Sequence, residues 1–458
     1  MAHSKDMLRR RGFRFFLSLV FPCLILIVRP FHIRFDQAMV LASLVLVVTW
    51  WSSGITGKIP ASCFLLGAFA CFGSAPLRTV FSFPLSENFY LICFSYLFSQ
   101  GIKKSGFAEK TLEPLLLRYV NTSFKVLVSV FLVLAVTIPV IPQPLARLII
   151  VAEIYRNYLE KTGASGPQKD FLLFAVFQVY AIVNGVSINA DIILNTSAVG
   201  FSGLALTNAQ WIRGMALPTA VFCVLTIAML GLFERFMVRG PVLRVREEKK
   251  TATAPLGKKD RAAFLLIGIT VLFWISGPLH HINHTLITIT GVLLMFVFGI
   301  LKFEDLKAID ISTMVFLSAA FAIGGVMKSS GIADVVFSRV ESVFPPEYSA
   351  LYILVIIFVT MGMHIFLGSN TTTMSVVLPP LLMICGKKLP GEAVLYIVYV
   401  SLMAHYLLPF HSVAMMIGAG NNYFPARLVS RMGIPAMLLI FFVIFFVFLP
   451  WWRFIGLL

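Results

Sequence analysis

The 458-residue chain is 59% hydrophobic and only 12% charged, a composition that excludes an ordinary soluble domain and predicts a polytopic membrane protein. Its formal net charge of +17 comes from Lys and Arg residues that stand between apolar runs. We therefore attribute this charge to membrane topology and to contact with anionic membrane lipid, and we expect no nucleic-acid partner.

Apolar runs of membrane-crossing length recur from the start of the chain to its end. Residues 1–37 combine a basic start with a first apolar run and contain no small-residue cleavage site, which favours an uncleaved first span over a signal peptide. The fold class that we expect is all-α, with about 11 transmembrane helices, near 15–28, 38–52, 60–74, 84–102, 170–200, 210–233, 262–277, 285–301, 312–327, 392–418 and 431–449.

Two further apolar stretches, 121–162 and 348–386, are each too long for one helix and are interrupted by a Pro-rich or polar patch. This pattern predicts two re-entrant hairpins, which enter the membrane and return to the same side. Non-helical backbone at membrane depth is tolerated only where it is buried in protein or lines a cavity.

An internal repeat relates the two halves of the chain. The segments KKSGFAE (103–109) and KSSGIAD (328–334) share a pattern, and each stands between a span and a hairpin. We therefore expect two inverted repeats, 38–234 and 262–458, which is the organisation of a secondary transporter with a site at mid-membrane.

The linker 235–261 joins the repeats and carries nine Lys or Arg and three acidic residues. The Lys and Arg bias places this linker and the N-terminus in the cytoplasm and the C-terminus outside, in a cell (inner) membrane that the chain crosses many times.

The most informative polar stretch is GSNTTTMSVVLPP, residues 368–380, at the tip of the second hairpin. A half-helix that begins there offers unpaired N–H groups to an anion, and Ser369, Asn370 and Thr371 add hydroxyl and amide groups. The same oxygens suit a small hard cation such as Na⁺. A helix cap or hydrogen bonds between helices would also explain these residues.

This stretch resembles the second Ser-Asn-Thr signature of the divalent anion/sodium symporter family. Residues 103–119 are similar to the family's interfacial helix, 138–163 to its first hairpin, and 408–424 to its second broken helix. The resemblance implies transport of di- or tricarboxylate or sulfate by an elevator-like motion, usually in a homodimer. It also implies substrate contacts from Ser369, Asn370 and Thr371, and a candidate cation site at Ser369, Asn370 and Gly418.

The chain departs from the family where the first hairpin has Gln143, Pro144 and Leu145 in place of Ser-Asn-Thr. Arg147 follows, as in exchanger-like members. A charge inside a membrane segment is costly and usually functional, so we expect Arg147 to bind substrate in place of a cation, although a structural pairing would also explain it. Asp191 is its most obvious partner or, alternatively, a proton-coupling group. Asn195 and Thr196 form a second candidate substrate-binding cluster in the first broken helix.

Secondary transport of small divalent organic anions, by exchange or ion-coupled symport, is therefore the function that we expect. The alternatives are a sodium-coupled sulfate or sulfonate transporter, a polytopic membrane enzyme and a non-transporting relative of a carrier. We expect no enzymatic activity, no catalytic residues, no bound metal and no cofactor, with Na⁺ as a candidate coupling ion. The three His residues of HHINH (280–284) are better explained by a loop than by metal binding.

Overall fold

Helices account for all regular secondary structure in the described part of the computed structural model, which confirms the all-α prediction for that part. The structure describes residues 2–53, 55–141, 143–238, 243, 258–280, 282–332, 335, 344–367 and 369–458. The chain forms two compact units. Unit 1 comprises Met1–Phe89, Ser197–Leu204 and Asp310–Leu402, and unit 2 comprises Tyr90–Thr196, Ala205–Ile309 and Met403–Leu458.

Unit 1 contains the first helices of the chain and the second predicted hairpin. Its helices are α1 (Ala2–Val28), η1 (Pro30–His32), α2 (Phe35–Ser53), α3 (Lys58–Phe72), α4 (Leu77–Val80), η2 (Phe83–Leu85), α15 (Ile311–Ser329), α17 (Ala350–Leu367), α18 (Asn370–Cys385) and α19 (Gly391–Met403), whose final residue belongs to unit 2.

The interior of unit 1 forms where α15 packs against α3, α4 and α18. Phe69 of α3 and Ile323 and Val326 of α15 are buried in this apolar cluster. Helices α15 and α4 approach each other closely at Gly325, where a larger residue would not fit, because a Cβ atom there would lie 2.7 Å from Cγ2 of Thr79. Helix α17 packs against α18, so the two arms of the second hairpin lie together.

Unit 2 contains the first hairpin and the two broken helices. Its helices are α5 (Glu87–Ser105, whose first three residues belong to unit 1), α6 (Phe107–Tyr119), α7 (Ser123–Thr137), α8 (Pro144–Thr162), α9 (Gly166–Val183), η3 (Asn184–Val186), η4 (Ile188–Ala190), α10 (Leu194–Ser202, shared with unit 1), α11 (Asn208–Phe233), η5 (Glu234–Val238), α12 (Lys258–Ile275), α13 (Gly277–His280), α14 (His284–Val297), η7 (Phe303–Ala308), η9 (Pro409–His411), α20 (Val413–Gly420), α21 (Ala426–Val443), η10 (Ile444–Phe448) and α22 (Leu449–Phe454).

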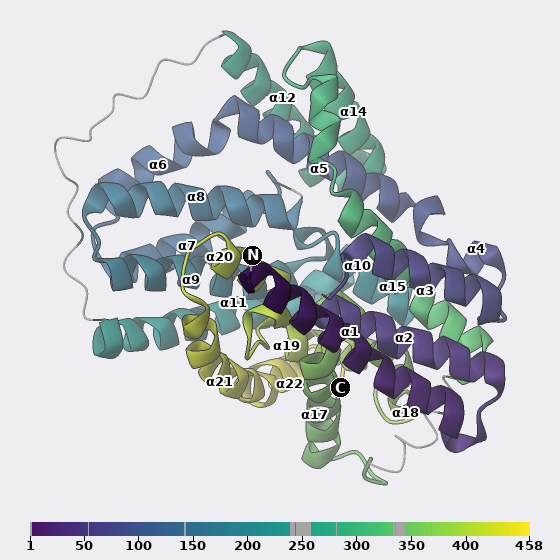
Figure 1. Ribbon diagram of the computed structural model, residues 1–458. Helices are drawn as coiled ribbons and strands as arrows, with labels where there is room; N and C mark the ends of the chain where they lie inside the picture. The colour runs from purple at the N-terminus through teal and green to yellow at the C-terminus, as the bar shows by residue number, and fades with distance from the viewer. Residues whose placement is uncertain are drawn as a thin grey trace. The chain divides into compact units, whose positions relative to one another are not determined.

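Helix α9 is the central element of unit 2. Helices α7, α8 and α11 pack against it, and α7, α8 and α9 run side by side in Figure 1. All but one of the residues from Phe171 to Val183 are buried, on every face of the helix. A helix that is apolar all round is stable where neighbours surround it, which explains why α9 shows no polar stripe.

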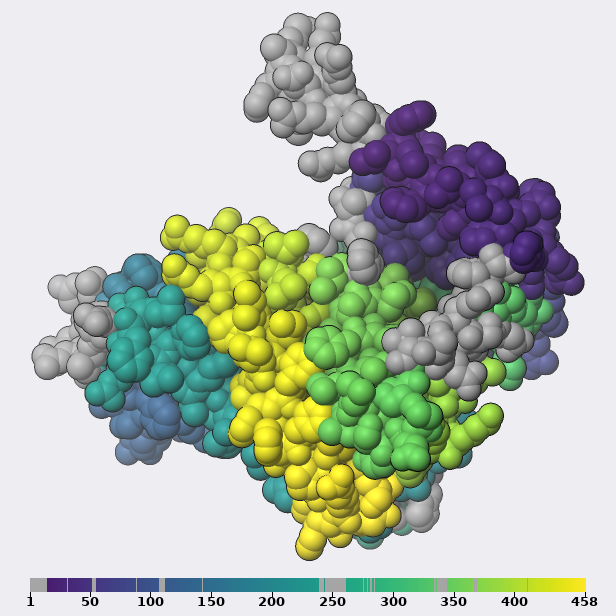
Figure 2. Space-filling view, turned by 90° about the horizontal axis from the view of Figure 1, so that it is seen from below, coloured from purple at the N-terminus to yellow at the C-terminus, as the bar shows by residue number. Residues whose placement is uncertain are grey.

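Large apolar side chains remain exposed on several helices. Helix α17 exposes Leu351 and Phe358, and α21 exposes Ile434, Leu438 and Phe442. The C-terminal helices, yellow in Figure 2, lie on the face seen there. Apolar surface of this extent is stable in contact with lipid chains rather than water.

Four helical segments of the described chain are long and apolar enough to cross a membrane: Gly166–Val186, Asn208–Val238, Ile311–Ser329 and Ala426–Phe454. Nine shorter apolar helices accompany them. The count of eleven spans and the inverted repeat therefore stay predictions. In each predicted hairpin one helix ends and another begins: α7 ends at Thr137 and α8 begins at Pro144, and α17 ends at Leu367 and α18 begins at Asn370. The re-entrant course of both hairpins stays a prediction.

The predicted domain boundaries also stay predictions, because each compact unit combines segments from both halves of the sequence. Most of the basic linker 235–261 lies outside the described residues, as do Ala333 and Asp334 of the second repeat segment.

Candidate functional site

The tip of the second hairpin lies in unit 1, where α17 ends at Leu367 and α18 begins at Asn370. Ser369 is the N-cap residue, and its hydroxyl accepts a long, 3.5 Å hydrogen bond from the N–H of Thr372. The hydroxyl of Thr373 donates to the carbonyl of Ser369 at 2.8 Å. Ser369 is therefore used first as a cap, as Ser commonly is at a helix start. Gly368 lies outside the described residues.

Two polar atoms at this tip are buried without a hydrogen-bond partner among the described residues. They are Oδ1 of Asn370 and the hydroxyl oxygen of Thr372. A buried polar atom left unpaired costs about 1–3 kcal/mol, so such atoms in a native fold call for an explanation. Asn370 Oδ1 can only accept, which suits a cation or a ligand hydroxyl, whereas the adjacent helix N-terminus suits an anion.

The tip of the first hairpin lies in unit 2 and begins α8 at Pro144. Gln143 is the N-cap residue, and its Oε1 accepts a hydrogen bond from the N–H of Ala146. Pro144 at the first helical position loses nothing by lacking an N–H, because that group has no partner inside a helix. Gln-Pro-Leu is therefore a sound helix start even though it departs from Ser-Asn-Thr. Pro142 lies outside the described residues.

Arg147 is completely buried one turn after this start. Its Nη1 donates to the carbonyl of Ile141 at 2.8 Å, and its Nη2 donates to Oδ1 of Asn184 at 2.8 Å and to the carbonyl of Ala190. The guanidinium therefore joins the hairpin tip to the break between α9 and α10. Its Nε has no partner among the described residues.

The break between α9 and α10 is held by its own side chains. Asn195 is buried, and its Nδ2 donates to the carbonyls of Asn184 and Ser187, both at 2.8 Å. The hydroxyl of Thr196 donates to the carbonyl of Ile192. Asn195 and Thr196 thus satisfy backbone groups that the interrupted helix leaves unpaired. Their predicted contact with substrate stays a prediction.

Asp191, in the same break, caps α10. Its Oδ1 accepts from the N–H groups of Ile193 at 3.0 Å and Leu194 at 2.8 Å. Arg147 donates to the carbonyl of Ala190, the residue that precedes Asp191, so the two charged groups lie near each other in space although each has its own hydrogen-bond partners.

Gly418 lies in α20 of unit 2, whereas Ser369 and Asn370 belong to unit 1. A Cβ atom at residue 418 would lie 2.2 Å from Cζ of Phe424 and 3.1 Å from Cε1 of Phe177. The Gly418 carbonyl accepts from the N–H of Tyr423 at 2.9 Å. Packing therefore explains this glycine, and its predicted role in a cation site stays a prediction.

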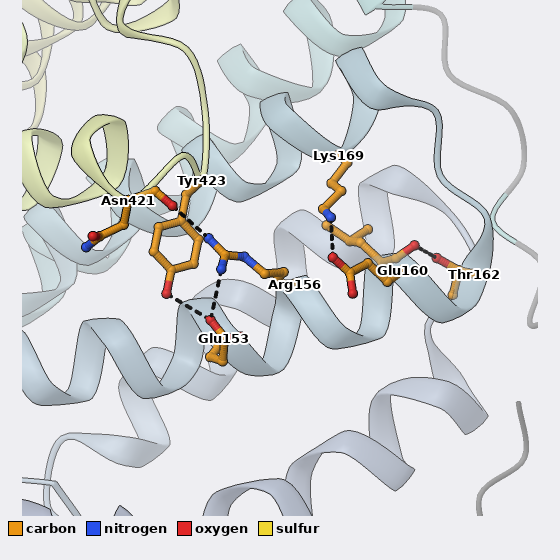
Figure 3. A network of polar contacts seen from close by, with 8 residues as sticks. Glu153, Arg156, Glu160, Thr162, Lys169, Asn421 and Tyr423 are labelled. Carbon is orange, nitrogen blue, oxygen red and sulfur yellow. Dashed lines mark hydrogen bonds and ion pairs between the residues drawn. The ribbon is translucent and has the colours of Figure 1, made fainter.

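A polar network that we did not predict from the sequence ties α8 to the connection between α20 and α21. Tyr423 donates from its hydroxyl to Oε2 of Glu153 at 2.9 Å, and Arg156 Nη1 lies 3.5 Å from the same oxygen. The Arg156 guanidinium lies 3.7 Å from the centre of the Tyr423 ring and also donates to the carbonyl of Asn421 (Figure 3). The i,i+3 spacing of Glu153 and Arg156 was the one available signal.

Two of the histidines make local contacts. His411 is buried and accepts at Nδ1 from the N–H of Leu407, while His280 bonds to the Phe273 carbonyl and the Ile282 N–H. His281 lies outside the described residues, and within those described no group of three or more His, Cys, Asp or Glu could hold a metal ion.

Comparison with known proteins gives one family match and two relatives. The family model of the sodium:sulfate symporter transmembrane region matches residues 4–458. A Methanocaldococcus jannaschii protein named "Uncharacterized transporter" is 24% identical over 257 residues, which are 54% of this chain and 56% of that protein. A Bacillus subtilis protein named "Putative malate transporter" is 21% identical over 256 residues, 53% of this chain and 54% of its own. The matched regions thus span about half the length of these curated relatives.

Proposed function

Because the chain belongs to the sodium:sulfate symporter family of membrane transporters, we propose that it is a secondary active transporter of small divalent organic anions. The Ser-Asn-Thr motif at residues 369–371 agrees with this family. The observation that carries the proposal is the tip of the second hairpin. There, the start of α18 combines backbone N–H groups with the buried, unpaired hydroxyl of Thr372, which can donate to an anionic oxygen. A helix start of this kind stabilises a carboxylate without any fixed positive charge.

A dicarboxylate is the substrate class that we favour over sulfate. The name of the B. subtilis relative includes malate, which belongs to this class. Di- and tricarboxylates also present separate oxygens that can accept from N–H groups and from hydroxyls. Sulfate, from the name of the family, is the second candidate.

Coupling by anion exchange, with weak or no dependence on sodium, is the second part of the proposal. A sodium ion at the first hairpin would need oxygen ligands, and three oxygens near this tip are the Ile141 carbonyl, Asn184 Oδ1 and the Ala190 carbonyl. All three accept from Arg147. The residues at this position therefore do not fit a bound cation, since a fixed guanidinium takes its oxygens and supplies its charge.

Single-site sodium coupling through the second hairpin is the runner-up. Asn370 Oδ1 and the Thr372 hydroxyl are hard oxygen donors of the type that Na⁺ binds, so the residues there do fit a cation. A homodimer, an elevator-like motion, a cytoplasmic N-terminus and an inner-membrane location complete the proposal. They rest on the family and on the Lys and Arg bias.

Counterflow in proteoliposomes tests both parts. Vesicles loaded with unlabelled succinate, malate or sulfate are each exposed to the same anion in labelled form, with choline replacing Na⁺ on both sides. Exchange of the dicarboxylates without Na⁺ is the expected result. A steep requirement for more than one Na⁺ per substrate contradicts the coupling proposal, exchange of sulfate alone selects the second candidate, and no flux of any anion favours a non-transporting relative of a carrier.

A further inference from the structure

A proline interrupts the hydrogen-bond pattern of α11 in the first half of the helix. Pro218 lies inside α11 and is buried, as is Gly214 one turn before it. In a regular helix the carbonyl of Gly214 would accept from the N–H of residue 218, but proline has no N–H. This buried carbonyl therefore needs a donor from outside its own helix, and the start of α11 lacks one of the bonds that would fix its direction relative to the rest.

Helix α22 supplies the missing donor. Trp452 is completely buried, and its Nε1 donates to the carbonyl of Gly214 at 2.9 Å. The neighbouring Trp451 donates from Nε1 to the carbonyl of Arg213 at 2.9 Å, and Arg213 donates from Nη2 to the carbonyl of Ile455, the C-cap residue of α22, at 2.8 Å. Three hydrogen bonds thus join the start of α11 to a helix that lies 238 positions further along the chain.

The start of α11 in turn holds the break between α9 and α10. Trp211 is completely buried and donates from Nε1 to the carbonyl of Gly185 at 2.9 Å. Asn208 accepts at Oδ1 from the N–H of Ile188, also at 2.9 Å. The guanidinium of Arg147 bonds within the same break. Helix α22, the start of α11 and the break therefore form one series of hydrogen-bonded contacts inside unit 2.

We propose that Trp452 is a positioning residue for the break between α9 and α10. By bonding to the carbonyl that Pro218 leaves unpaired, its indole fixes the direction of the start of α11, and the start of α11 fixes the break. The inference goes beyond the proposed function, because it concerns the order of the break and holds for any substrate.

The indole N–H of Trp452, rather than its ring, is the group to remove in a test. The ring also packs against Phe448, with ring centroids 5.5 Å apart, and a phenylalanine ring could make that contact. Trp452→Phe therefore keeps an aromatic ring and leaves the Gly214 carbonyl without its donor. Pro218→Ala supplies an N–H inside α11 that can pair with the same carbonyl, so it should make the indole N–H dispensable.

Trp451→Phe is the matched control, since it makes the same change at the next residue. Its acceptor, the carbonyl of Arg213, keeps the helix N–H one turn further along, so no carbonyl should lose its only donor. Hydrogen–deuterium exchange is measured by mass spectrometry on the purified full chain, for the wild-type protein, the three single variants and the double variant of Trp452 and Pro218. The peptides compared cover the break, residues 184–195, and α14, which packs against α12 in the same unit.

Trp452→Phe should raise the exchange rate of the break about tenfold, because a buried carbonyl is left unpaired, while α14 exchanges at the wild-type rate. In the double variant the break should exchange at the rate of Pro218→Ala alone, and this non-additivity measures the coupling between the two residues. Trp451→Phe should exchange at the wild-type rate in both peptides.

Three results overturn the inference: wild-type exchange in the break of Trp452→Phe, an equal rise in the break and in α14, or the same effect of Trp452→Phe with and without Pro218. An equal rise in both peptides would indicate a general loss of stability instead of a loss of position. If Trp452→Phe does not fold, the double variant decides. A folded double variant whose break exchanges at the rate of Pro218→Ala supports the inference, and failure of the double variant to fold overturns it.

Discussion

Replacing Arg147 with Gln removes the guanidinium that three buried oxygens use. The Ile141 carbonyl, Asn184 Oδ1 and the Ala190 carbonyl each lose a charge-assisted donor. Such bonds contribute about 1.5–3 kcal/mol each, and each buried acceptor that is left unpaired costs about 1–3 kcal/mol. We therefore expect Arg147→Gln to abolish sodium-free exchange and to lower the melting temperature markedly.

Sodium should partly restore the stability that Arg147→Gln loses, because the substitution frees oxygen atoms that the guanidinium had bound and that can coordinate Na⁺. An ion that binds only the folded state at 100 times its dissociation constant stabilises that state by about 2.7 kcal/mol. The melting temperature of Arg147→Gln should therefore rise in NaCl relative to choline chloride, whereas the wild-type protein should melt at the same temperature in both salts. Any exchange that remains in the variant should require Na⁺.

Arg156→Gln is the matched control, since Arg156 lies in the same helix but bonds to Glu153 and Asn421. It should lose stability without gaining a response to sodium. If Arg147→Gln melts at the wild-type temperature, or if it responds equally to NaCl and choline chloride, the guanidinium does not occupy a cation's place and the reasoning is wrong.

Three further predictions concern other parts of the chain. Asn370→Ala should raise the KM for succinate about tenfold or more because it removes the side-chain NH₂ group, the part of this amide that can donate to a carboxylate, and an unchanged KM in a well-folded variant would exclude this tip from the site. A cysteine at Thr251, in a background without other cysteines, should resist an impermeant thiol reagent in intact cells because the linker is basic; rapid labelling would reverse the topology. Burial raises the pKa of Asp305, but hydrogen bonds from Lys104, the N–H of Lys302 and Gln100 outweigh it and hold the pKa below its usual value. The resulting stability is present above the ordinary aspartate pKa of about 3.9 and is lost as the pH falls through the lower pKa of the folded state. Asp305→Asn should therefore have a lower melting temperature than the wild-type protein at pH 7, and its melting temperature should fall less on acidification. An equal fall of the melting temperature in both proteins across that pH range would contradict this.

Sequence patterns predict the helical breaks well, since breaks follow local chemistry. Ser369 and Asn370 interrupt an apolar run with residues that favour a helix start, and Pro144 can occupy the first turn of a helix but not its interior. Each hairpin therefore has its break where the sequence predicts it.

The partners of Arg147 were not predictable, because two of the three acceptors are backbone carbonyls. Every residue has such a carbonyl, so the sequence does not indicate which one accepts. The third, Asn184, lies 37 residues away along the chain. Asp191 seemed the natural partner by charge alone, yet its carboxylate caps α10. Gln143 seemed only a departure from a motif, and its unpaired amide nitrogen became visible only once the cap fixed its oxygen.

The network of Glu153, Arg156 and Tyr423 constrains how this sequence can drift. Glu153 and Tyr423 are 270 positions apart, and each of the three groups relies on the other two for charge, ring contact or hydrogen bond. A single substitution leaves an acid, a base or a phenol without its counterpart, so the replacements are coupled and their order matters. Replacing this contact between α8 and the α20–α21 connection by another one therefore requires a less stable intermediate sequence, unless two codons far apart in the gene change together.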